Sequence, residues 1–144
     1  MFPKTDWAPL IPHAGTMCLL DAVRLWDQRT IHAVSASHAR MDNPLRGADG
    51  LHAVHLAEYG AQAMAVHGAL LARANGANAV RPGRLVSLRD VQLFEEYIDR
   101  LDGMLDVHAE CQYADDSGAQ YAFRVEHRGR LLASGRAAVI HPES

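Results

Sequence analysis

Residues Ala53–Ala74 read AVHLAEYGAQAMAVHGALLARA, an alanine-rich run without proline and with few β-branched side chains. That composition favours an α-helix, which over this length would span about 33 Å. Apolar residues surround the helix on almost every side, and Asn75-Gly76 is a typical stop after its last turn. We therefore predict a central helix that is buried on most of its sides.

Segments with strand patterns flank this helix. Leu19–Trp26 and Thr30–Ser37 precede it and are joined by a hairpin at Asp27–Arg29. The later segment Leu105–Tyr113 alternates apolar and polar side chains without exception, as a strand with one buried face does. Four strands are predicted after the helix, at Arg84–Tyr97, Leu105–Tyr113, Gln120–Glu126 and Leu131–Ile140. This order predicts an α+β fold of five to six antiparallel strands, with the helix packed on one face of the sheet.

Length, charge and cysteine spacing narrow the class of protein. The chain has 144 residues, which fits a single domain over residues 1–144. A formal charge of −3 with neutral histidines predicts no broad attraction to nucleic acid or to anionic membranes. Polar side chains interrupt the longest apolar run, and the N-terminus lacks a signal-peptide pattern, so we expect no membrane span and a cytoplasmic location. Cys18 and Cys111 lie far apart, which favours two reduced thiols over a metal or redox pair.

Four motifs occur in register along the chain. They are PHAGTMCLLDAV at Pro12–Val23, EYGAQAMA at Glu58–Ala65, Pro82-Gly83 before a strand, and GRLLASG at Gly129–Gly135. In sequence and order they resemble the β-hydroxyacyl-acyl-carrier-protein dehydratases, and within that family the dehydratase-like subunits found with aryl polyene pigment synthesis. The resemblance covers most of the chain and implies a hotdog fold, in which one long helix is wrapped by an antiparallel sheet.

The resemblance also implies a site. In the family, a carboxylate at the start of the helix and a histidine from the preceding loop act together across a dimer interface, and Glu58 matches the carboxylate. Dehydration of a 3-hydroxyacyl thioester to the trans-2-enoyl product needs a base for the α-proton and an acid for the leaving hydroxyl, each contributing roughly 10²–10⁴-fold. Backbone N–H groups at the helix N-terminus would polarise the thioester carbonyl. The alternative role for Glu58 is to stabilise the first helical turn.

The histidine is where the sequence departs from the family. The His-Phe-Pro-Gly motif is missing, and Pro44 occupies the position of its histidine, fourteen residues before Glu58. The catalytic candidates are His55, three residues before Glu58, and His38, at the end of the second strand, with His52 a further possibility. The remaining alternative is that this chain supplies no catalytic histidine.

Other polar residues have two interpretations each. Tyr59 and Gln62 are candidate substrate-binding residues, although Gln62 would equally satisfy neighbouring backbone groups. His13 is expected to form loop hydrogen bonds rather than to catalyse. His52 and His55 are spaced i, i+3, but no H-E-x-x-H or paired His/Cys motif occurs, so we expect neither a metal nor a cofactor.

Three functions follow from this comparison, in order of preference. The first is a dehydratase acting on acyl carrier protein in fatty-acid-like or aryl polyene biosynthesis. The second is a non-catalytic hotdog subunit that binds acyl chains or completes a heterodimeric dehydratase, and the third is an acyl thioesterase. Acyl carrier protein is the expected partner of the first. Pairing with a second hotdog chain, as a homodimer or a heterodimer, would hide an exposed strand edge.

Overall fold

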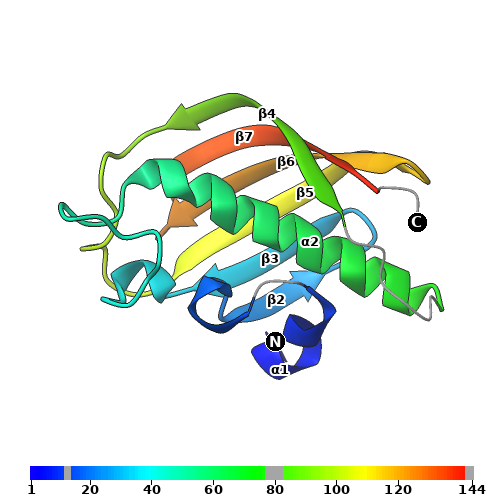
Figure 1. Ribbon diagram of the computed structural model, residues 1–144, viewed down its shortest axis with the longest axis horizontal. Helices are drawn as coiled ribbons and strands as arrows, with labels where there is room; N and C mark the ends of the chain where they lie inside the picture. Colours follow the sequence, from blue (N-terminus) through cyan, green and yellow to red (C-terminus); the bar gives the residue numbers. More distant parts are fainter. Residues whose placement is uncertain (12–13, 77–82, 142–144) are drawn as a thin grey trace.

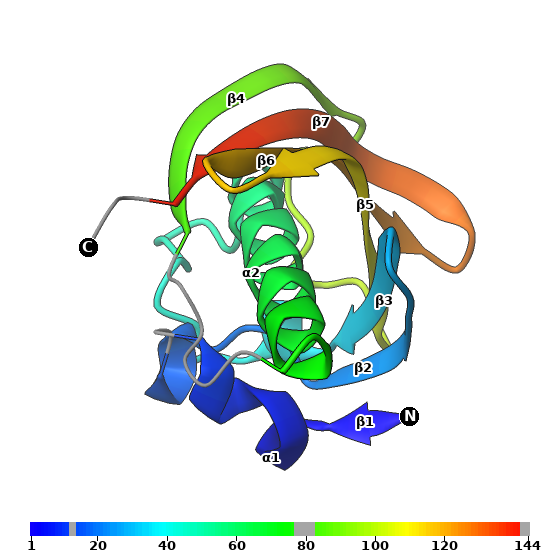
Figure 2. The same ribbon diagram turned by 90° about the vertical axis from the view of Figure 1, so that its right-hand side faces the viewer.

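One long helix lies inside the curve of a single antiparallel sheet (Figures 1 and 2). The computed structural model describes residues 1–11, 14–76 and 83–141. Helix α2 spans Leu56–Ala74, and the sheet has seven strands in the order β1-β2-β3-β5-β6-β7-β4. The strands are β1 (Phe2–Pro3), β2 (Ala22–Trp26), β3 (Thr30–Ser35), β4 (Arg84–Leu93), β5 (Leu105–Asp115), β6 (Gly118–His127) and β7 (Arg130–Ile140). The predicted α+β architecture is confirmed.

The strand count is one more than the five to six predicted. The additional strand, β1, has only two residues, which is too short to leave a periodic pattern in the sequence. It precedes a short helix, α1 (Lys4–Trp7), and a 3-10 turn, Ala8–Leu10. The indole of Trp7 is fully buried against the core, so this N-terminal segment closes one side of the molecule.

Strand β2 and helix α2 both begin three residues later than predicted, and local hydrogen bonds explain the difference. Strand β2 begins at Ala22 rather than at Leu19, because side chains bind both the N–H and the carbonyl of Leu19. Helix α2 begins at Leu56 rather than at Ala53, since a separate 3-10 turn occupies Ala53–His55. The imidazole of His52 caps that turn by accepting a hydrogen bond from the N–H of Val54 (3.0 Å).

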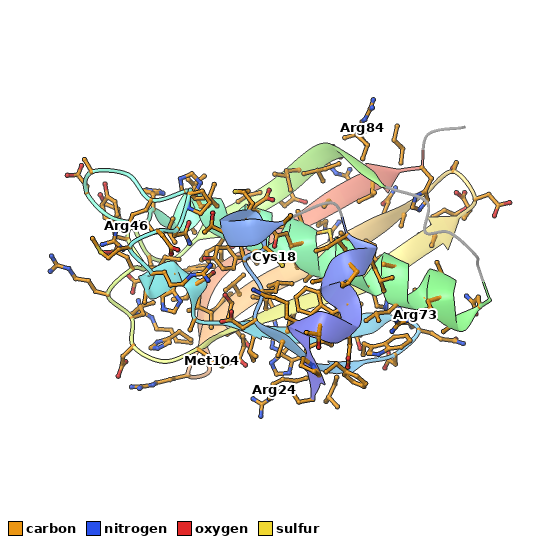
Figure 3. All side chains as sticks on the ribbon, turned by 60° about the horizontal axis from the view of Figure 1, so that its bottom comes forward. Cys18, Arg24, Arg46, Arg73, Arg84 and Met104 are labelled. Atoms are coloured by element: carbon orange, nitrogen blue, oxygen red, sulfur yellow. The ribbon has the colours of Figure 1, made fainter. Side chains whose placement is uncertain are left out.

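Small residues let α2 approach the sheet closely. A Cβ atom added to Gly60 would lie 2.7 Å from the ring of Phe123 on β6, so only glycine fits at this crossing. Polar contacts also join the last turn of the helix, and the loop that precedes the helix, to other parts of the chain. Arg73, in the last turn, donates to the carbonyl of Asp6 (3.1 Å), and Arg46, before the helix, pairs with Asp99 (3.4 Å). Figure 3 shows these two arginines toward opposite ends of the molecule.

Strand β4 forms one end of the sheet and carries an unusually apolar surface. It pairs with β7 on one side, and within the described part of the chain its other edge has no strand partner. Four of its side chains share the face of the sheet that holds the buried residues Ala133 and Ala137, and each is 37–41% exposed. They are Leu85, Leu88, Val91 and Leu93. An apolar strand edge of this kind is a surface that proteins normally cover.

Candidate active site

Glu58 lies in the first turn of α2, where the helix dipole favours a negative charge. Its side chain is half-buried, and Oε1 accepts a hydrogen bond from Nε2 of Gln62 one turn later (3.4 Å). It borders a stripe of partly exposed residues that recur at helical spacing along α2: Ala57, Ala61, Ala65, Gly68 and Ala72. The carboxylate therefore stands at the leading end of the one side of the helix that the described chain leaves partly open.

Gln62 joins the helix to the segment that precedes β2. Its Nε2 donates to the carbonyl of Met17 (2.6 Å), and its Oε1 accepts from the N–H of Leu19 (2.8 Å). Together with the contact to Glu58, these bonds occupy both amide hydrogens and the carbonyl of a fully buried side chain. The predicted role of Gln62 in substrate binding stays a prediction, while its contacts match the alternative of satisfying backbone groups.

Tyr59 is fully buried, and its hydroxyl lies between two polar side chains from the segment before α2. It is 2.7 Å from Oγ of Ser37 and accepts from Nδ2 of Asn43 (3.0 Å). Burial is the main cause that raises the pKa of Tyr59, so the hydroxyl keeps its proton at neutral pH. Direct contact between Tyr59 and substrate likewise stays a prediction.

A general base must be unprotonated and accessible to substrate, and each of the two candidate histidines has one of these properties. His38 is fully buried, and its Nε2 lies 2.7 Å from the carbonyl of Leu101, which can only accept, so Nε2 carries the proton. Burial lowers the pKa of the imidazole, and Nδ1 has a lone pair with no hydrogen-bond partner among the described residues. His55 is the residue before α2 and is partly exposed. His38 is thus in the neutral form that a general base requires, whereas His55 has the exposed surface through which a substrate would reach it.

Sequence reasoning did not select several polar residues of this region. Ser35, Ser37 and Asn43 are buried and hydrogen-bonded to one another or to Tyr59. Asn43 gave one signal, because an Asn-Pro pair marks a turn, but nothing in the pattern of the two serines separates them from ordinary strand residues. His13 and Pro82, which belong to the quoted motifs, lie outside the described residues.

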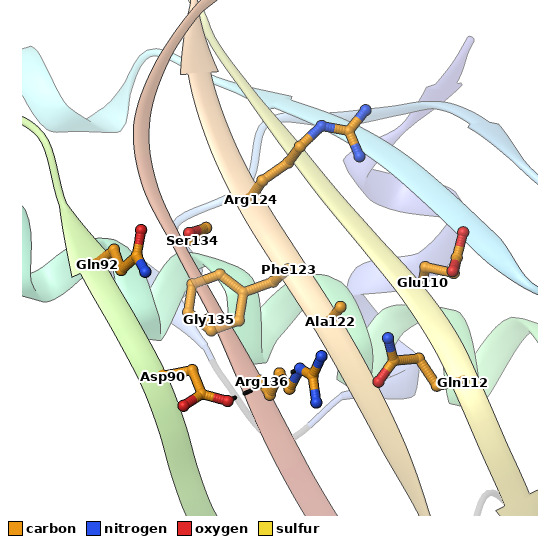
Figure 4. Close-up of a pocket in the computed structure, with 10 residues that line it drawn as sticks. All are labelled: Asp90, Gln92, Glu110, Gln112, Ala122, Phe123, Arg124, Ser134, Gly135 and Arg136. Carbon is orange, nitrogen blue, oxygen red and sulfur yellow. Dashed lines mark ion pairs between the residues drawn. The ribbon is translucent and has the colours of Figure 1, made fainter.

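A hollow of about 520 Å³ lies on the opposite, outer face of the sheet (Figure 4). Small residues, Ala122 and Ser134, form part of its lining, and α2 lies behind the sheet. Its arginines already have acidic partners, since Arg136 pairs with Asp90 (3.9 Å) and Arg124 with Glu126 (3.7 Å). We do not assign this hollow to the candidate site, because the sheet separates it from the helix that carries Glu58.

Neither a metal cluster nor a membrane-spanning helix occurs over residues 1–11, 14–76 and 83–141. These residues contain no group of three or more His, Cys, Asp or Glu side chains placed to hold a metal ion. In the same part of the chain, none of the helices has both the length and the apolar character needed to cross a membrane.

A family model described as ApeP-like, ApeP dehydratase, matches residues 5–144. The chain belongs to this family. The resemblance to dehydratases found in the sequence is therefore confirmed, and the function of this ApeP-like chain is of the dehydratase type. No significant match was found among curated protein sequences.

Solved structures confirm the hotdog fold of this ApeP-like chain. A chain of the ApeI:P dehydratase heterocomplex from Xenorhabdus doucetiae superposes with a TM-score of 0.85 at 20% identity, covering 100% of this chain and 93% of that one. A single-residue variant of an HP0420 homologue from Helicobacter felis gives 0.69 at 11% identity, covering 99% and 89%. A hypothetical thioesterase from Streptococcus pneumoniae, solved with coenzyme A, gives 0.62 at 11% identity, covering 85% of each chain. At these identities the likeness concerns the fold.

Proposed function

We propose that the chain dehydrates 3-hydroxyacyl thioesters carried on acyl carrier protein, in fatty-acid-like or aryl polyene biosynthesis. The observation that carries this proposal is the position of Glu58, at the leading end of the open side of α2 and held by Gln62. A base removes the α-proton of the thioester, and Glu58, acting as the acid, transfers a proton to the 3-hydroxyl as the C–O bond breaks. Water leaves and the trans-2-enoyl thioester remains.

The base comes from one of two sources. Within this chain, His38 has a neutral imidazole with a free lone pair, and His55 lies immediately before α2. The other source is a histidine of a second hotdog chain. The loop around Pro44, which lacks the family motif, supports that second source. A heterodimer is the assembly we favour, because the similar fold in the ApeI:P dehydratase heterocomplex belongs to a two-component enzyme.

The surface for such a partner is strand β4 together with the open side of α2. The side chains of the apolar row are 37–41% exposed; the row consists of Leu85, Leu88, Val91 and Leu93. The edge of β4 that lies away from β7 has no strand partner within the described chain, so its backbone groups are available for pairing. A second chain that pairs with β4 would extend the sheet and bury this row. It would also bring its own residues toward α2, and hence toward Glu58.

A dehydration assay tests the proposal. The chain is supplied with a 3-hydroxyacyl carrier protein, alone and with a second hotdog dehydratase chain, and the products are analysed by mass spectrometry. Loss of one water without hydrolysis supports a dehydratase, and activity that requires the second chain supports the heterodimer. Free acid as the main product would identify a thioesterase instead. No product under either condition would overturn the proposal.

Variants assign the roles. Glu58→Gln should reduce dehydration at least 10²-fold, the order expected for loss of a positioned acid. Glu110→Gln is the matched control, because that carboxylate is exposed on β5 and lines the outer hollow. His38→Asn and His55→Asn are tested separately in the two-chain assay. If neither lowers the rate, the partner supplies the base; full activity of Glu58→Gln would refute the role of Glu58.

A further inference from the structure

A continuous series of buried hydrogen bonds runs from the loop before α2 to the segment before β2. Nδ2 of Asn43 lies 3.0 Å from the hydroxyl of Tyr59, which lies 2.7 Å from Oγ of Ser37. The hydroxyl of Ser37 is 2.9 Å from that of Ser35, which in turn lies 2.5 Å from the carbonyl of Leu19. All four side chains are at most 4% exposed.

The direction of every bond in this series is fixed. The carbonyl of Leu19 can only accept, so Ser35 donates its single hydroxyl hydrogen to that carbonyl. Ser37 must then donate to Ser35, and Tyr59 must donate to Ser37, while the amide of Asn43 donates to Tyr59. Hydroxyl groups that donate in one direction polarise one another, which strengthens each bond of the series.

The series continues to Glu58 through the other side of Leu19. The N–H of Leu19 donates to Oε1 of Gln62 (2.8 Å), and Nε2 of Gln62 donates to the carboxylate of Glu58 (3.4 Å). Leu19 is therefore held by a side chain at both its carbonyl and its N–H. Because Tyr59 follows Glu58 directly on α2, the part of the series from Tyr59 to Glu58 begins and ends on adjacent residues of the same helical turn.

We infer that Tyr59 is a positioning residue for Glu58: its hydroxyl, through Ser37, Ser35, Leu19 and Gln62, fixes the carboxylate against the first turn of α2. The inference rests on the proposed catalytic role of Glu58. Tyr59 itself has no exposed surface. The segment before α2 thus supplies Ser37 and Asn43, whose side chains both bond the hydroxyl of Tyr59 on the helix.

Tyr59→Phe is the direct test, since it removes one oxygen atom and keeps the ring. We expect kcat to fall about 10- to 100-fold with little change in KM, because a carboxylate displaced by a fraction of an ångström is less well aligned. The alkaline limb of the pH–rate profile, which reports deprotonation of the acid Glu58, should also move. Tyr121→Phe is the matched control: that hydroxyl is equally buried but bonds His67, in the second half of α2.

A second measurement does not depend on activity. Hydrogen exchange of the Leu19 amide, followed by NMR, should accelerate in Tyr59→Phe and remain unchanged in Tyr121→Phe, provided both variants are folded. Ser37→Ala interrupts the same series at another link and replaces Tyr59→Phe if the latter does not fold. It should reproduce both effects.

The outcomes separate this inference from the proposed function. If Glu58→Gln abolishes activity while Tyr59→Phe and Ser37→Ala match Tyr121→Phe in kcat, pH profile and Leu19 exchange, Tyr59 has no positioning role. If Glu58→Gln is fully active, the proposed role of Glu58 fails. In that case accelerated Leu19 exchange in Tyr59→Phe would still establish the hydrogen-bond series but not its catalytic purpose.

Discussion

The imidazole of His67, in the middle of α2, accepts a hydrogen bond from the hydroxyl of Tyr121 on β6, with 2.7 Å between Nδ1 and Oη. Its other nitrogen, Nε2, lies 2.8 Å from the carbonyl of Asp27 in the turn between β2 and β3. A carbonyl only accepts, so Nε2 carries a proton, and burial, which lowers the pKa of the imidazole, keeps the ring neutral so that Nδ1 is the acceptor. One buried histidine thus joins the helix to two separate parts of the sheet.

This arrangement predicts a loss of stability in mild acid. Burial lowers the pKa of His67 from its ordinary value of 6.5, so below that pH the unfolded chain binds a proton that the folded chain does not. The free energy of unfolding should be constant above pH 6.5 and fall below it, by at most about 1.4 kcal/mol per pH unit for one group. Urea unfolding between pH 5 and pH 8 measures it.

A variant measures how much of this pH dependence of the free energy of unfolding is due to His67. In His67→Gln the slope below pH 6.5 should become smaller without vanishing, because burial also lowers the pKa of His38 and of His108. An unchanged slope would show that His67 does not take part in the acid sensitivity.

Two glycines of α2 should respond oppositely to the same substitution. Gly60→Ala places a Cβ 2.7 Å from the Phe123 ring and should destabilise the fold by about 1–3 kcal/mol, as overpacking does. Gly68→Ala meets no atom within 4 Å and should stabilise the isolated chain by up to about 1 kcal/mol, because alanine is the better helix former. Thermal unfolding of both variants checks the pair, and equal effects would contradict the packing described.

Charge on strand β4 should prevent association without unfolding the chain. Leu88→Glu places a carboxylate in the apolar row, where pairing would bury it without a counter-ion. Leu25→Glu, on β2, is the control because Leu25 is 70% exposed at the other end of the sheet. Analytical ultracentrifugation, with and without the second hotdog chain, should show dissociation in Leu88→Glu alone. Retained association would place the interface elsewhere.

Asp99, in the loop after β4, bonds two residues of the loop that precedes α2. Its Oδ1 accepts from the N–H of Leu51 (3.0 Å), and Oδ2 pairs with Arg46 (3.4 Å). The bond from Leu51 is the leading cause that lowers the pKa of Asp99, so its stabilisation is present at neutral pH and is lost as the pH falls through the lowered value. Asp99→Asn should lower the free energy of unfolding by about 1–3 kcal/mol. Asp49→Asn, an exposed control, should leave it unchanged in urea unfolding.

Much of the fold could be predicted because its signals are local. The run Ala53–Ala74 has the composition of a helix, and Leu105–Tyr113 has the alternation of a strand, so both elements appear where expected, with shifts at their ends. Glu58 could be selected because a motif and a helix start coincide at one position. The site beyond it could not, since Ser35 and Ser37 look like other small residues of a strand.

The sequence by itself determined the order of elements and the central helix, because periodicity and helix propensity depend on neighbouring residues. It indicated the candidate acid only through the resemblance of one motif to a family. Only the tertiary structure decided which polar groups meet. Leu19 and Gln62 are 43 residues apart, and His67 and Tyr121 are 54 apart, yet each pair forms a buried hydrogen bond. Such a bond depends on where distant segments fold together, and its energy is gained only when both partners have left water.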